Sequence, residues 1–142
     1  MSFIRTALCI VAVAALAGCG AMGGGTGSGK TVNVSLSGGE EVPPVAAAGS
    51  GRGSFTVGND GAVSGSVTTS GVQGTMAHIH RGARGQNGPV VVPLTKSGDT
   101  YSAPSGAKLS AADLQAFREG RLYVNVHTDR NKGGEVRGQL TP

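Results

Sequence analysis

Aromatic residues, charged residues and cysteine are all scarce in this 142-residue chain. It has no Trp, two Tyr and three Phe, so a large aromatic-lined ligand pocket is not expected. Charged residues make up 14% of the chain, well below the usual ~25%, and the formal net charge of +4 is not gathered in a block. Because nucleic-acid surfaces need clustered cations and stacking aromatics, we expect no nucleic-acid partner.

Long hydrophobic runs are also missing, except near the N-terminus. The apolar stretch from Ala7 to Ala17 is shorter than the ~20 residues of a membrane-spanning helix. It follows Arg5 and precedes small residues, as in a secretory signal peptide, which we place at residues 1–18. The run LAGC that ends at Cys19 resembles the bacterial lipobox, which implies cleavage before Cys19 and acylation of its sulfur. An ordinary signal peptide with an incidental cysteine is the alternative.

Residues 19–30 would then form a lipidated cysteine followed by a flexible tether, GAMGGGTGSG, with no apolar period. The expected partner of this segment is a membrane, reached through the lipid, and the expected location is the cell envelope. Gly20 stands where many Gram-negative lipoproteins retained at the inner membrane have Asp. The resemblance therefore favours the outer membrane, on its periplasmic side, if the source is Gram-negative.

Short alternating segments dominate the remaining domain, residues 31–142, and predict an all-β fold. Turn residues separate them, including Asn59-Asp60-Gly61, which is typical of a hairpin. Their spacing favours an antiparallel sandwich or barrel. The expected strands are 32–36, 53–57, 62–69, 75–80, 90–94, 100–103, 122–128 and 135–140.

One short helix is expected at residues 111–119. Ser110 is suited to the N-cap, Asp113 places negative charge in the first turn, and Gly120 follows the last turn. The helix carries no residues that suggest chemistry, so we expect it to cover an end or edge of the sheet.

The three histidines are the residues that most suggest a site. Alternation along a strand puts His78 and His80 on one face of 75–80 and His127 on one face of 122–128, each opposite an apolar face. If these strands are neighbours, three imidazoles meet on the outer face, a set suited to Cu(II) or Zn(II). Half-exposed histidines that bond loop carbonyls are the alternative.

Several motifs in order resemble the chordin-type CHRD domain. These motifs are LSGGEEVPPV from Leu36, AHIHRG from Ala77, GPVVVPL from Gly88, YVNVHT from Tyr123 and GGEVRGQ from Gly133. The resemblance covers about residues 31 to 140. It implies a secreted or lipid-anchored domain and brings no defined activity.

A more distant resemblance is to copper/zinc superoxide dismutases. His78-Ile79-His80, Gly88-Pro89 and VNVH ending at His127 follow the chain order of that family. The resemblance implies a Greek-key β-sandwich or barrel and copper, ahead of zinc, on the three histidines. The sequence lacks a fourth histidine for the metal bridge, a zinc ligand set in 81–89 and the disulfide cysteines, so dismutase activity is not expected.

Glu135 is a further candidate because the segment between 122–128 and 135–140 is polar and suited to a hairpin loop. That hairpin would bring Glu135 near His127, where its carboxylate could orient the imidazole or serve as a fourth ligand. A surface pair of Glu135 with Arg137 or Lys132 is the alternative.

Three functions follow. The first is a tethered, non-catalytic copper protein that sequesters or relays the metal and receives it from an envelope donor. The second is a metal-free adhesion or interaction module with an envelope protein partner, and the third is a copper-only redox enzyme. The enzyme question stays open, with a non-enzyme favoured, because no nucleophile elbow or carboxylate pair is present.

Overall fold

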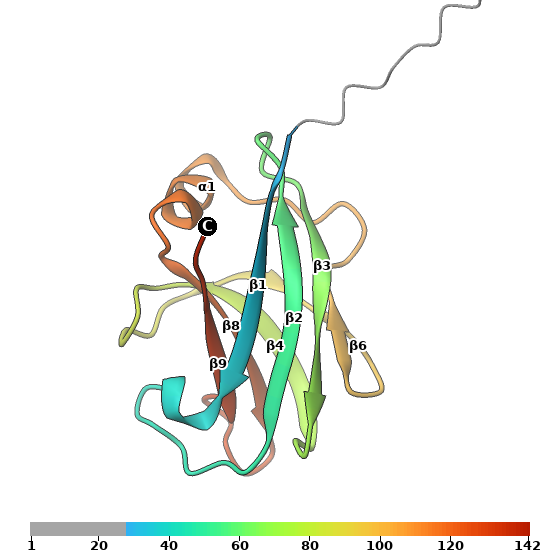
Figure 1. Cartoon of the computed structure of the whole chain (residues 1–142), viewed down its shortest axis with the longest axis vertical. Helices are drawn as coiled ribbons and strands as arrows, with labels where there is room; N and C mark the ends of the chain where they lie inside the picture. Colours follow the sequence, from blue (N-terminus) through green and yellow to red (C-terminus); the bar gives the residue numbers. More distant parts are fainter. Residues whose placement is uncertain (1–27) are drawn as a thin grey trace, which may run out of the picture.

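The computed structural model describes residues 28–142, which form a nine-stranded antiparallel sheet curled into a nearly closed barrel (Figure 1). This arrangement confirms the predicted all-β fold. The predicted signal peptide, Cys19 and most of the predicted tether lie outside the described residues. The strands are β1 (Lys30–Ser37), β2 (Ser50–Val57), β3 (Val63–Ser70), β4 (Gly74–Arg81), β5 (Val90–Pro93), β6 (Thr95–Ser97), β7 (Thr100–Ser102), β8 (Leu122–Thr128) and β9 (Val136–Leu140).

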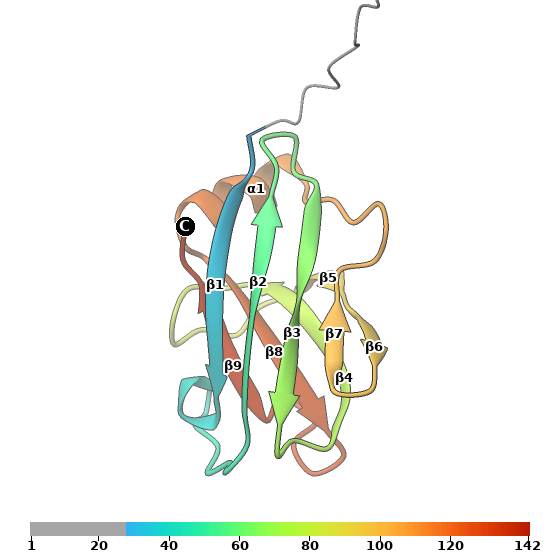
Figure 2. The ribbon, with the colours of Figure 1, turned by 45° about the vertical axis from the view of Figure 1, so that its right-hand side comes forward.

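The strand order is β5-β4-β8-β9-β1-β2-β3-β7-β6. The first three strands form a meander, after which β4 crosses to pair with β8 while β7 returns to pair with β3. These non-sequential neighbours produce the expected Greek-key crossings, and Figure 2 shows β1 to β3 in front of β8 and β9. The barrel is nearly closed because its two edge strands, β5 and β6, follow each other in the chain with only Leu94 between them.

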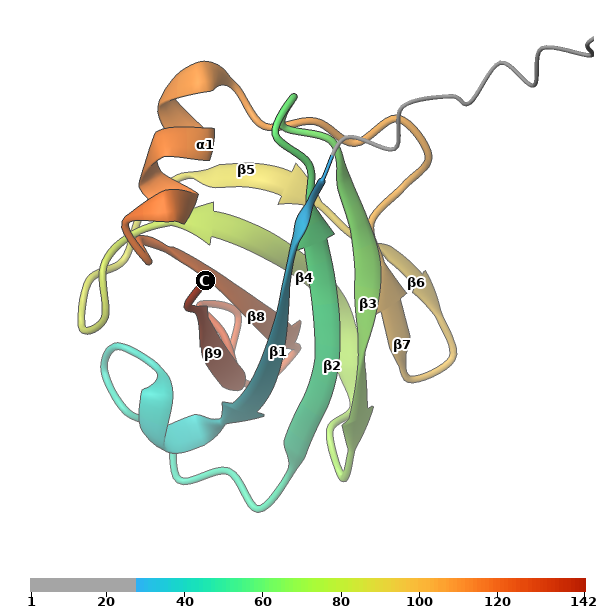
Figure 3. The same cartoon turned by 45° about the horizontal axis from the view of Figure 1, so that its top comes forward.

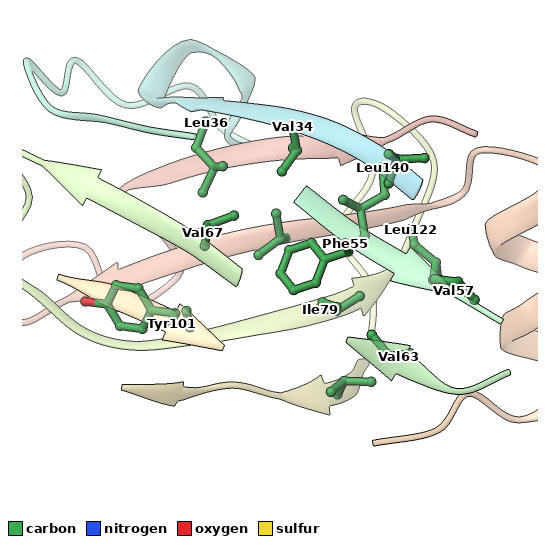
Figure 4. Close-up of a cluster of buried hydrophobic side chains, with 14 of the residues drawn as sticks. Val34, Leu36, Phe55, Val57, Val63, Val67, Ile79, Tyr101, Leu122 and Leu140 are labelled. Carbon is green, nitrogen blue, oxygen red and sulfur yellow. The ribbon is translucent and has the colours of Figure 1, made fainter. Parts of the chain in front are cut away.

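The core lies between the two sides of the barrel and follows from the alternation of the strands (Figure 4). On β1, for example, Val32, Val34 and Leu36 are buried and the residues between them are exposed. Val, Leu and Ile supply most of the volume, as the scarcity of aromatics requires. Phe55, Tyr101 and Phe117 are the bulky exceptions, and all three are buried.

The short helix α1 (Ala111–Arg118) is confirmed, one residue shorter than expected. The Ser110 side chain accepts a hydrogen bond from the backbone N–H of Asp113, as an N-cap should. Figure 3 shows α1 over one end of the barrel. In the described part of the chain, no helix is long and apolar enough to cross a membrane.

Two details differ from the sequence prediction. The segment Thr95–Ser97 forms β6, which was not predicted because all three residues are exposed and show no apolar alternation. A single turn of 3-10 helix, η1 (Gly38–Glu40), follows β1 directly and starts the segment that leads to β2. The predicted hairpin between β2 and β3 is present, and Gly61 adopts a positive φ of 87° there.

Candidate metal site

Histidines from the two neighbouring strands β4 and β8 converge on one side of the barrel wall. Ala77 and Ile79 of β4 lie in the core, so His78 and His80 lie on the opposite face. The β4–β8 register pairs Met76 with His127 and His78 with Asn125. The convergence predicted from strand alternation is therefore present.

The three imidazoles are close enough to hold one metal ion. One nitrogen from each ring lies within 4.8 Å of the others. His78 Nδ1 lies 3.0 Å from His127 Nε2. Two nitrogens at that separation can both bind one ion at bond lengths of about 2.0–2.1 Å, with an angle near about 90°.

Backbone carbonyls select the nitrogens that face the site. His127 Nδ1 lies 2.8 Å from the carbonyl oxygen of Lys132, and His80 Nδ1 lies 2.9 Å from that of Gly88. A carbonyl only accepts, so each of these Nδ1 atoms carries the hydrogen and each Nε2 keeps a lone pair in the neutral ring. His80 Nε2 is buried and has no hydrogen-bond partner. Hydrogen bonds to loop carbonyls are also expected of histidines with a purely structural role. In His80 and His127 they leave the Nε2 lone pair available to a metal.

The surroundings keep two of the rings neutral. Burial, with help from His127 and His80, lowers the pKa of His78 to about 4. Burial also lowers the pKa of His80, against the opposing effect of its hydrogen bond to Gly88. Neutral imidazole is the form that ligates metals, so His78 and His80 are ready to bind without first losing protons at neutral pH.

The outer face of the site is more buried than expected. His80 and His127 are only 8% and 7% exposed, and every residue of β8 is buried. The loop after β4 and the segment after β1 approach each other beside these strands (Figure 3). Arg84 forms an ion pair with Glu40, and the Asn87 side chain donates to the carbonyl of Val42, so the two segments are joined.

Tyr123 and Arg137 lie on the same face of the sheet as the histidines, as strand alternation predicts. The sequence suggested no role for them in the metal site. The Tyr123 ring lies parallel to the His80 ring, with centroids 4.8 Å apart and an angle of 3°. The Arg137 guanidinium carbon lies 3.4 Å from the Tyr123 ring centroid. The same guanidinium donates to the carbonyls of Ala83 and Gln86, so Arg137 also holds the loop after β4.

Glu41 is a buried carboxylate that sequence reasoning missed. It is 4% exposed and lies against the side-chain amide of Asn125. Burial raises its pKa to about 7, although the positive charge of Arg137 acts in the opposite direction. A side chain at Gly134, where φ is 139°, would collide with both Glu41 and Asn125. No local pattern marks Glu41, because it follows η1 in a segment without a period.

Glu135 lies elsewhere, which corrects the role expected for it. Its carboxylate accepts hydrogen bonds from the Thr128 hydroxyl at 2.7 Å and the Asn131 amide at 2.8 Å, and these bonds lower its pKa. It lines a separate polar hollow of about 470 Å³. The polar loop after β8 turns back so that the carbonyl of Lys132, not Glu135, orients His127.

Comparison with known proteins gives one result. The family model of the CHRD domain matches residues 32–140, which includes all nine strands apart from the first two residues of β1. No curated protein and no solved structure matches the chain.

Proposed function

Because the chain belongs to the CHRD domain family, which by itself specifies no ligand, we propose a function from the site: it binds one copper ion through His78, His80 and His127. The ligand atoms would be His78 Nδ1, His80 Nε2 and His127 Nε2. The carbonyls of Gly88 and Lys132 leave Nε2 of His80 and His127 free, and Nδ1 of His78 is the nitrogen that faces His127 Nε2.

The observation that carries this proposal is the unpartnered Nε2 of His80. A buried polar atom without a partner costs about 1–3 kcal/mol. His80 Nε2 is such an atom, and it belongs to the group of three imidazoles within ligand distance of one another. A metal ion bound by the three rings would remove that cost and would replace the contact between His78 Nδ1 and His127 Nε2 with two metal–nitrogen bonds.

The affinity order of the metals favours copper over zinc. Three imidazoles can bind either metal, and Cu(II) binds a given nitrogen site more tightly than Zn(II) does. Bound copper would have an open coordination position at which a donor or acceptor ligand could attach. We therefore propose sequestration or relay of the metal as the role, without catalysis.

We also propose that the domain works from a membrane surface in the cell envelope. The support is the lipobox-like sequence ending at Cys19 and the Gly-rich residues between it and Lys30. For a Gram-negative source we propose the periplasmic side of the outer membrane, with an envelope metal donor as the partner.

A copper titration tests the metal site. The protein used is the full chain carrying Cys9→Ser and Cys19→Ser, here named the thiol-free chain. It is purified in detergent and titrated with Cu(II), and binding is followed by electron paramagnetic resonance. We expect one Cu(II) per chain with nitrogen hyperfine coupling. His78 is the most exposed of the three rings. Loss of a residue that only hydrogen-bonds a metal ligand lowers affinity by about 10- to 100-fold, and His78→Ala, which removes a ligand, should lower it further.

The matched control is Ser64→Ala, an exposed position on β3, which should leave the affinity unchanged. Thermal unfolding of each variant without metal verifies that the fold is intact. Absence of stoichiometric binding, or equal affinity in His78→Ala, would overturn the proposal and favour the metal-free interaction module.

A further inference from the structure

Met76 is an exposed methionine beside the three histidines. It is the only methionine of residues 28–142, and it is 50% exposed, although methionine is usually buried. The core of the described residues contains no methionine, so Met76 has no part in the core packing.

Its position in the sheet places Met76 on the same face as the imidazoles. It precedes His78 by two residues on β4, and the register sets it directly opposite His127 on β8. Directly opposed residues on one face have Cβ atoms about 4.5–5.5 Å apart. The methionine side chain is unbranched and flexible, so its sulfur can turn toward a neighbouring ligand group.

The burial of the site leaves its opening on the Met76 side. His80 bonds to the loop after β4 and His127 to the loop after β8, and both are buried, whereas His78 is only partly buried and Met76 is exposed. A ligand that completes the coordination of an ion on the three rings would therefore come from the side of Met76.

We propose that the thioether sulfur of Met76 is a fourth ligand and that the cargo of the site is monovalent copper. Imidazole binds several metals, but a thioether is a soft ligand that favours Cu(I) over Zn(II). This inference rests on the proposed function and adds the oxidation state of the metal and the residue that selects it.

Affinity for two metals separates the contribution of Met76 from that of the histidines. In the thiol-free chain, Cu(I) is titrated without oxygen against a chromophoric chelator, and Zn(II) is titrated separately. Met76→Leu preserves side-chain volume and should lower Cu(I) affinity by about tenfold or more while Zn(II) affinity stays the same. The control is Ser64→Ala, the exposed position on β3 used above, which should change neither affinity.

Methyl NMR gives a direct readout of the sulfur. With methionine methyl groups labelled with ¹³C and Ag(I) as a redox-inert substitute for Cu(I), the Met76 methyl signal, assigned by its loss in Met76→Leu, should shift to completion at one equivalent. The signals of Met1 and Met22 serve as internal comparison and should not shift at that ratio.

The outcomes distinguish this inference from the proposed function. One outcome is that His78→Ala abolishes Cu(II) binding while Met76→Leu leaves the Cu(I) affinity unchanged and Ag(I) does not shift the Met76 methyl signal. In that case the inference is overturned and the histidine site stands. If the unsubstituted thiol-free chain binds neither Cu(II) nor Cu(I), both are overturned. Selective loss of Cu(I) in Met76→Leu together with the Met76 methyl shift supports the inference.

Discussion

The ring of Tyr123 lies parallel to the imidazole of His80, with only 3° between their planes. Tyr123 lies opposite His80 in the β4–β8 register, so the strand pairing itself sets up this stack. Arg137 contacts the ring of Tyr123, and the Tyr123 hydroxyl accepts a hydrogen bond from the backbone N–H of Gly88 at 3.3 Å. Gly88 is also the residue whose carbonyl bonds His80. Tyr123 therefore supports His80 both directly and through the loop.

Substitution of Tyr123 tests whether this stack positions a ligand. Tyr123→Phe keeps the ring and should leave copper affinity nearly unchanged. Tyr123→Leu removes a stack worth about 0.5–1.5 kcal/mol and should weaken copper binding by up to about tenfold, measured by the same Cu(II) titration. Equal affinities in the two variants would show that the ring does not position His80.

The elevated pKa of Glu41 predicts a pH-dependent stability. Its folded-state pKa of about 7 lies above the ordinary value of 4.5, so the folded state holds the proton more tightly than the unfolded state. The resulting stabilisation is complete below pH 4.5 and is lost as the pH rises to about 7. The charged groups near it are Arg137, which favours ionisation, and Arg84 and Glu40 on the neighbouring segments.

Glu41→Gln mimics the protonated carboxyl and isolates this effect. At pH 8 the variant should be more stable than the parent chain by up to about 3 kcal/mol, the equivalent of the pKa difference. At pH 4 the two should be equally stable. Denaturant unfolding at both pH values measures the difference, and a variant less stable than its parent at pH 8 would show that Glu41 is favourably ionised by Arg137.

Adjacent residues on β8 are predicted to respond differently to a new charge. Val124→Asp places a carboxylate in the core and should destabilise the fold by about 3–5 kcal/mol, as an unpaired buried charge does. Alternation alone would suggest that Asn125→Asp is tolerated, because Asn125 faces away from the core. The structure corrects this expectation, since Asn125 is 1% exposed and lies against Glu41.

Asn125→Asp should therefore also destabilise the fold, by about 1–3 kcal/mol at pH 8. This loss of stability would arise because the substitution places a second carboxylate beside that of Glu41. Adding Glu41→Gln should restore part of the stability lost in Asn125→Asp and none of that lost in Val124→Asp, as measured by a double-mutant cycle. Equal rescue of both variants would contradict the assigned neighbours.

The lipid anchor is tested by Cys19→Ser in the otherwise unchanged chain. The variant should move from the membrane to the soluble fraction, while thermal unfolding of the domain stays the same, because the lipid rather than the barrel would provide attachment. If the variant stays with the membrane in detergent-free fractionation, the lipoprotein assignment is wrong.

The sequence predicted the features that depend on local alternation and failed on those that depend on loops. Eight of the nine strands and the shared face of His78, His80 and His127 follow from periodicity. The N-cap at Ser110 follows from its residue type just before the helix. The burial of that face does not, because the segments that cover it are rich in Gly and Pro and have no period. Glu41 was missed, and Glu135 was assigned a role that the Lys132 carbonyl holds, for this same reason.

The register across the sheet also determines which way the site faces. Ser37, Arg137, Asn125 and His78 form one row through successive strand pairs. Ser37 ends β1, and Lys30 begins it seven residues earlier, a distance of about 23 Å along the strand. Figure 1 shows that the chain enters β1 at the end of the barrel near α1, away from η1. Attachment through Cys19 would therefore join the barrel at the end opposite the three histidines, and the flexible tether would leave them accessible to soluble proteins.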